Sequence, residues 1–90
     1  MRIEVPRIFA IVPKGDYHLL RALLADLPDE FTIWVQRRLF GRRSFEEVTG
    51  RLAAVEQVDI RDYERFCRKS NIAPSQTSLD DWATSIHWMH

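Results

Sequence analysis

Apolar residues recur at helical spacing in the middle of the chain, and this recurrence predicts a helix. The apolar positions stand three or four residues apart, at Phe45, Val48, Leu52 and Val55. Ser44 precedes them and Glu47 follows Ser44 by three positions, which is the pattern of a capping box. The spacing therefore predicts a helix from residue 45 to about residue 56.

A second helix is predicted from residue 60 to about residue 70. Its apolar face consists of Ile60, Tyr63, Phe66 and Cys67. Asp59 is suited to cap the start of this helix, while Asn71 and Pro74 are suited to end it. Two helices joined by a short turn are typical of a helix-turn-helix.

Basic side chains accompany both predicted helices. On the second helix they lie opposite the apolar face, at Arg61, Arg65, Arg68 and Lys69. Before the first helix they cluster at Arg37, Arg38, Arg42 and Arg43. In a helix-turn-helix the first set would enter the major groove and the second would contact the phosphate backbone. Arginine on the outer face of an amphipathic helix is also common as ordinary solvated surface.

The overall charge does not favour strong nonspecific DNA binding. The 90 residues contain 13 basic and 13 acidic side chains and have a sequence pI of about 6.8. The distribution is uneven, because residues 31 to 70 carry nine basic and six acidic side chains. This excess of three positive charges is modest against the several phosphates that a stable DNA complex neutralises.

The central half of the chain resembles the small-terminase-like helix-turn-helix proteins of Mu-type phages. The resemblance covers residues 27 to 70 and rests on Leu27, Pro28, Trp34, Leu39, Phe45, Leu52, Ile60, Tyr63, Glu64, Arg65 and Phe66. It implies DNA binding through the helix that begins at Ile60, and a phage or mobile-element origin. The chain departs from the family pattern at Arg61, where a serine is usual, and outside residues 27 to 70.

The amino-terminal third predicts a strand followed by a helix. Residues 3 to 12 alternate and then become continuously apolar, and Pro6 places this strand at the edge of a sheet. Asp16 is suited to begin a helix that buries Leu19, Leu20, Leu23, Leu24 and Leu27. Residues 31 to 36 fit a helix better than a strand. If they are helical, the amino-terminal strand has no partner within the chain, which predicts a possible homodimer through this strand.

The carboxyl-terminal segment predicts a last short helix, with Ser78 and Asp81 as its cap pair. Its aromatic residues Trp82 and Trp88 either dock on the core of the protein or anchor a protein partner.

Together these elements predict one small domain over residues 1 to 90, with an N-terminal arm 1–13 and a C-terminal helical tail 78–90. The expected fold is mainly α, with four to five short helices, a helix-turn-helix-like pair and an N-terminal strand or arm. The alternative is an α+β fold with strands 3–12 and 31–36.

Candidate catalytic chemistry is sparse. The single cysteine, Cys67, lies on a predicted buried face, and His18, His87 and His90 have no nearby pattern of partner residues. We therefore expect no enzyme activity, no cofactor and no metal site. No apolar run is long enough to span a membrane or to form a signal peptide, so a cytoplasmic location is expected.

Two functions follow from the sequence. The first is a small helix-turn-helix-like DNA-binding protein. The second is a non-enzymatic protein-binding module, such as an inhibitor or adaptor, that acts through exposed aromatic and basic surface.

Overall fold

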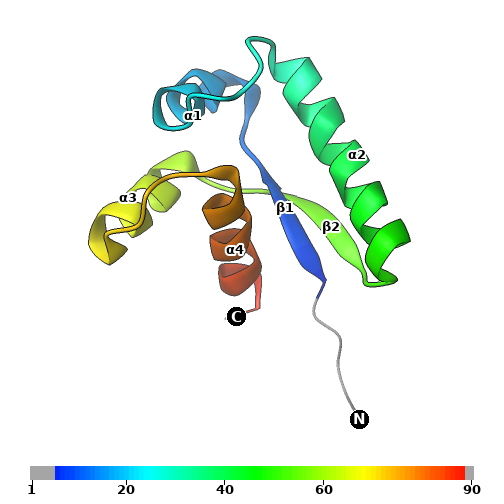
Figure 1. The fold of residues 1–90 in the computed structure, drawn as a ribbon. Helices are drawn as coiled ribbons and strands as arrows, with labels where there is room; N and C mark the ends of the chain where they lie inside the picture. The colour runs from blue at the N-terminus through cyan, green and yellow to red at the C-terminus, as the bar shows by residue number, and fades with distance from the viewer. Residues whose placement is uncertain (1–5, 89–90) are drawn as a thin grey trace.

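The computed structural model describes residues 6–88, which form a two-stranded sheet with helices on both faces (Figure 1). The elements in chain order are β1 (Arg7–Ile11), a 3₁₀ turn (Lys14–Asp16), α1 (Tyr17–Leu23), α2 (Phe31–Thr49), β2 (Ala53–Gln57), α3 (Ile60–Ser70) and α4 (Gln76–His87). Helices account for most of the described residues. The prediction of a mainly α fold with an N-terminal strand is confirmed.

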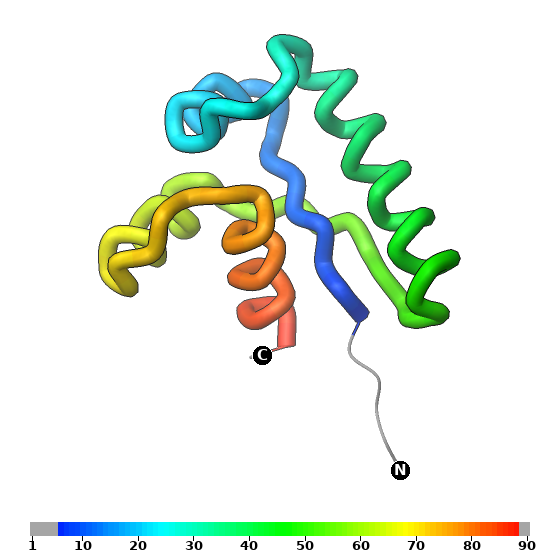
Figure 2. The backbone as a smooth tube through the Cα atoms, viewed as in Figure 1, coloured from blue at the N-terminus to red at the C-terminus, as the bar shows by residue number. Residues whose placement is uncertain are grey.

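The two strands run parallel and lie side by side although they are far apart in the chain (Figure 2). The register pairs Arg7 with Ala53 and Ile11 with Gln57. Parallel neighbours need a long crossover connection, and here α1 and α2 provide it. Helix α2 lies on one side of the sheet, while α1, α3 and α4 lie on the other (Figure 1).

The alternating pattern of β1 divides its side chains between these two sides. Ile8, Ala10 and Val12 are completely buried in the core formed with α1, α3 and α4. Phe9 points the other way and contacts Phe45 of α2, with ring centroids 5.9 Å apart. Because successive side chains of a strand point to opposite faces, this single strand anchors both layers of helices.

Helix α4 closes the outer edge of β1. The amide of Ile8 donates to Thr84 Oγ1 at 3.0 Å, and the amide of Ala10 donates to Asp80 Oδ1 at 2.9 Å. The other edge of β1 is paired with β2. The predicted homodimer through the amino-terminal strand is therefore wrong over residues 7–11, because both edges are already occupied within the chain.

Helix α2 starts at Phe31, so the helical prediction for residues 31–36 is confirmed and the alternative strand is wrong. The predicted helix start at residue 45 is also wrong, because α2 continues through Ser44 to Thr49. Gly50 ends the helix in the left-handed conformation, with φ +67°. Ser44 therefore lies inside a helix instead of capping one.

The helix predicted from residue 45 to residue 56 ends early, and its second half is β2. Val48 is 84% exposed and Leu52 is 58% exposed, so the presumed apolar stripe does not face the core. Residues 53–57 gain a parallel partner in β1 that local periodicity could not reveal. The helix-turn-helix-like pair is consequently wrong, because a strand precedes α3.

Helix α3 follows the prediction closely. Asp59 caps it by accepting a hydrogen bond from the amide of Arg61, and Asn71 ends it in the left-handed conformation. Ile60, Tyr63 and Cys67 are buried, as their spacing predicted. The Tyr63 hydroxyl group bonds Ser75 and Ser78 and thereby fixes the start of α4 against α3.

The cap of α4 lies three residues before the predicted one. Ser75 and Ser78 form a reciprocal capping box, and the helix begins at Gln76. Trp82 is buried against Tyr63, whereas Trp88 is 43% exposed. The C-terminal tail thus docks on its own core, and residues 89 and 90 lie outside the described residues.

Candidate partner-binding surface

The two predicted clusters of basic residues do not form one surface. Arg37, Arg38, Arg42 and Arg43 belong to α2, while Arg61, Arg65, Arg68 and Lys69 belong to α3. These helices lie on opposite sides of the sheet (Figure 1). The two clusters could therefore not contact one DNA duplex together, as the predicted helix-turn-helix would require.

Arg38 is not available for binding, because it is buried in an ion pair. Its guanidinium lies 2.5 Å from Asp80 Oδ1 and also donates to the carbonyl oxygen of Ala10 at 3.3 Å. The ring of Phe9 lies 5.5 Å from the Arg38 guanidinium carbon. Arg38 and Asp80 together satisfy the outward carbonyl and amide of Ala10, so they serve the fold.

Nearby carboxylates offset most of the positive charge of α3. Arg65 pairs with Asp62 at 3.3 Å, and Arg68 pairs with Glu64. Arg61 lies 3.6 Å from Asp16. On α2, Arg42 pairs with Glu46 at 2.9 Å, while Arg37 and Arg43 are exposed. Lys69 is also exposed, so α3 offers less positive charge to a polyanion than its sequence indicates.

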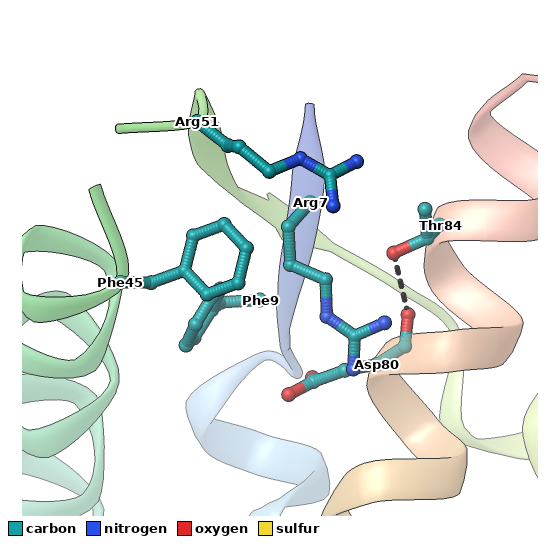
Figure 3. A pocket seen from close by; sticks show the side chains of 6 residues that line it. All are labelled: Arg7, Phe9, Phe45, Arg51, Asp80 and Thr84. Carbon is teal, nitrogen blue, oxygen red and sulfur yellow. Dashed lines mark hydrogen bonds between the residues drawn. The ribbon is translucent and has the colours of Figure 1, made fainter. Parts of the chain in front are cut away.

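A pocket of about 490 Å³ lies where β1, α2 and α4 meet (Figure 3). Six residues line it: Arg7, Phe9, Phe45, Arg51, Asp80 and Thr84. Its size is within the range of pockets that hold small ligands or single side chains of a partner. The strand, both helices and the turn before β2 all contribute, so the pocket exists only in the folded chain.

The apolar wall of the pocket consists of Phe9 and Phe45, which meet edge to face (Figure 3). Gly41 allows α2 to approach this wall, because a Cβ atom there would lie 3.2 Å from Phe9 Cε2. Edge-to-face packing of two rings fixes their orientation. The two rings therefore form one apolar wall at the pocket.

Two arginines also line the pocket. Figure 3 shows Arg51 above Arg7, with both side chains extending away from the Phe9 and Phe45 rings toward the side of Thr84 and Asp80. Arg7 also pairs with Asp81 at 2.5 Å, and its side chain is 29% exposed. The Asp80 carboxylate is already neutralised by Arg38. The pocket thus combines two arginine side chains, one of them paired with Asp81, with an aromatic surface.

Further apolar side chains lie along α2 beside the pocket. Val48 follows Phe45 by three residues, which places these two on neighbouring parts of the helix surface, whereas Phe40 lies about 140° from Phe45 around the helix. Phe40 is 70% exposed and Val48 is 84% exposed. An exposed apolar patch with a basic margin is characteristic of protein interaction sites.

The hydroxyl and carboxylate of the pocket already have partners. The Thr84 hydroxyl accepts from the amide of Ile8 and donates to the carbonyl of Asp80, and the Asp80 carboxylate pairs with Arg38. Within residues 6–88, no group of three or more His, Cys, Asp or Glu side chains is placed to hold a metal ion.

Sequence reasoning missed the pocket residues, although two signals pointed to them. The alternation in residues 3 to 12 implied that Phe9 faces away from Ile8, toward a second layer. Arg51 was assigned to the interior of a helix, and only the termination of α2 at Gly50 places it at the pocket.

Comparisons of the chain with protein-family models, with curated proteins and with solved structures found no match. Across the part of the chain that the structure describes, none of the helices has the length and apolar character needed to cross a bilayer.

Proposed function

We propose that this protein is a non-enzymatic protein-binding module whose pocket receives an acidic side chain of its partner beside an apolar one. The supporting observation is that Arg7 and Arg51 line one pocket together with the rings of Phe9 and Phe45. A carboxylate would accept hydrogen bonds from the guanidinium groups, while the apolar neighbour would pack on the rings. Tight partner anchors commonly combine these two contacts.

The partner in this proposal is an acidic peptide segment that also carries an aromatic or aliphatic residue. Val48 extends the apolar contact along α2 beyond the pocket. The neutral net charge of the chain is compatible with a protein partner, since binding of this kind does not depend on a large positive field.

Duplex DNA is the second candidate, supported by the exposed basic side chains of α3. Three of these arginines have carboxylates close by, and the helix-turn-helix frame is absent from the described residues. We therefore rank DNA below a protein partner. The proposed phage or mobile-element origin rests on the sequence resemblance alone.

A peptide library displayed on phage tests the proposal. Selection on the wild-type protein should enrich peptides that contain Asp or Glu next to an apolar residue. Arg51→Glu should weaken the best synthetic peptide about tenfold or more, because it removes a charged hydrogen bond and adds repulsion. Arg43→Glu is the matched control, since Arg43 is an exposed arginine of α2 outside the pocket lining.

Two results would contradict the proposal. One is enrichment of no acidic peptide. The other is peptide binding that Arg43→Glu weakens as much as Arg51→Glu does. A parallel salt titration with mixed-sequence duplex DNA distinguishes the second candidate. DNA affinity that falls with salt and is lost in Arg65→Glu/Arg68→Glu would favour DNA binding.

A further inference from the structure

The sheet has one closed edge and one open edge. On β1, side chains of α2 and α4 satisfy the outward groups of Ala10, and Thr84 satisfies the outward amide of Ile8. A two-stranded sheet always has a second edge, which here belongs to β2. Protein folds usually cover or disrupt such an edge, because an uncovered strand pairs with another chain.

The register identifies the outward-facing residues of β2. The amide of Arg7 donates to the carbonyl of Leu52, and the amide of Val58 donates to the carbonyl of Ile11. In a parallel ladder every second residue bonds to the neighbouring strand. Residues 52, 54, 56 and 58 therefore bond to β1, and residues 53, 55 and 57 point their backbone groups away from it.

Little of this outward edge is satisfied within the described chain. Glu46 Oε2 accepts a hydrogen bond from the amide of Ala53 at 3.1 Å. The ladder leaves the outward amide and carbonyl groups of Val55 and Gln57 without a strand partner among residues 6–88. This half of the edge is open to an added strand.

We infer that a second copy of this chain occupies the open edge, with the two β2 strands antiparallel and centred on Val55. Val55 would then face its own counterpart and exchange both backbone hydrogen bonds with it. Ala53 would face Gln57 of the second copy, and its amide would exchange the bond to Glu46 for one to that strand. The result is a four-stranded sheet with β1 at each outer edge, where α4 already covers it.

The cross-strand neighbours in this register are complementary. Leu52, which is 58% exposed, faces the second copy's partly buried Val58. The Arg51 side chain lies in the pocket beside Thr84, so the apolar contact carries this pairing. Apolar cross-strand pairs stabilise antiparallel strands.

The helices above the sheet also fit this pairing. The twofold axis places both α2 helices on the same face, about 10 Å apart, which is twice the strand spacing of about 4.8 Å. This separation is typical of packed helices. Glu46 of α2 reaches the edge of β2. Leu39 lies on the same side of α2 as Glu46 and is 47% exposed. It is therefore placed to pack against the second helix.

Light scattering coupled to size-exclusion chromatography, over a range of protein concentrations, tests the dimer. The expected mass of the wild-type protein is twice its 10.7 kDa at high concentration. Leu39→Glu and Leu52→Glu should each raise the dissociation constant about tenfold, because each loses an apolar contact twice by symmetry. Val48→Glu is the matched control, since Val48 lies about 180° from Leu39 around α2.

A cross-link tests the register independently of surface charge. Val55→Cys should form an interchain disulfide on mild oxidation, since paired residues across antiparallel strands lie about 5.5 Å apart at their Cα atoms. Glu47→Cys, on the exposed surface of α2, should not. The native Cys67 is buried and should not interfere.

A wild-type protein that stays monomeric at every concentration would overturn the inference. So would a dimer that tolerates both Leu39→Glu and Leu52→Glu, or one that Val48→Glu disrupts equally. A dimer sensitive only to the first two substitutions, together with the Val55→Cys cross-link, would establish it.

Discussion

At the scale of single residues, the ion pair between Arg38 and Asp80 joins three elements. It links α2 to α4, and both side chains also bond the backbone of Ala10 in β1. Both side chains are less than a tenth exposed. A buried pair is retained where it also satisfies polar groups that an apolar replacement would leave without partners. Here those groups are the outward amide and carbonyl of Ala10.

Asp80→Ala should therefore lower the free energy of unfolding by about 3–5 kcal/mol, since it leaves the Arg38 charge buried without a counterion. Urea denaturation followed by circular dichroism measures the change. The double variant Arg38→Leu/Asp80→Leu removes both charges but still deprives Ala10 of its bonds, so it should remain less stable than wild type. A double variant as stable as wild type would show that sealing the β1 edge contributes nothing.

At the scale of elements, the end of α2 decides what the following residues become. Gly50 adopts φ +67°, a conformation that other residues adopt only at a cost. The chain turns there and enters β2 three residues later. A longer helix would have carried residues 53–57 away from β1.

Gly50→Ala should consequently destabilise the protein by about 1–2 kcal/mol, the cost of a Cβ atom in the left-handed region. Open space surrounds this position, so the effect is conformational and not a clash. Gly15→Ala is the control, because Gly15 also has open space around it and no positive φ, and its effect should stay within about 0.5 kcal/mol. Equal unfolding midpoints for the two variants would contradict this reasoning.

At the scale of the whole molecule, one core joins the two layers of helices. Trp34 of α2 contacts Tyr17 of α1, and Tyr63 of α3 contacts Trp82 of α4. Both tyrosines belong to this core. Burial raises the pKa of Tyr17 and of Tyr63 above the ordinary value of 10.0, even though nearby arginines and hydrogen bonds to Ser78 and Ser75 act in the opposite direction.

This shift predicts a loss of stability at alkaline pH. The folded state holds the two phenol protons more tightly than the unfolded state does. Their contribution to the free energy of unfolding is therefore complete below about pH 10, and it is lost as the pH rises through the pKa values of the folded state. The free energy of unfolding should thus fall as the pH rises above about 10, the pKa of an unfolded tyrosine. The double variant Tyr17→Phe/Tyr63→Phe, followed by the same urea titrations, should show a smaller fall. An equal fall would exclude the tyrosines as its source.

Local patterns were sufficient wherever a residue's role depends on its neighbours in the chain. The Asp59 cap, the buried face of α3, the left-handed Asn71 and the helical start at Phe31 all follow from residues within one or two turns. The alternation of β1 likewise predicted a strand, because its two faces differ in burial. These features determined the mainly α fold class.

Contacts between residues far apart in the chain decided the second strand, the buried ion pair and the pocket. Residues 53–57 become a strand only because β1 offers a parallel partner 46 positions earlier in the chain, and helical spacing gave no sign of it. Arg38 looked like a surface arginine until Asp80, 42 positions away, proved to be its buried counterion. The pocket of Arg7, Phe9, Phe45 and Arg51 likewise requires β1, α2 and the turn after α2 to meet.

The sequence by itself determined which segments favour helix or strand, since those preferences arise from local backbone and side-chain contacts. Tertiary structure alone decided which charges are buried and where the candidate site lies, because both depend on residues that only folding brings together.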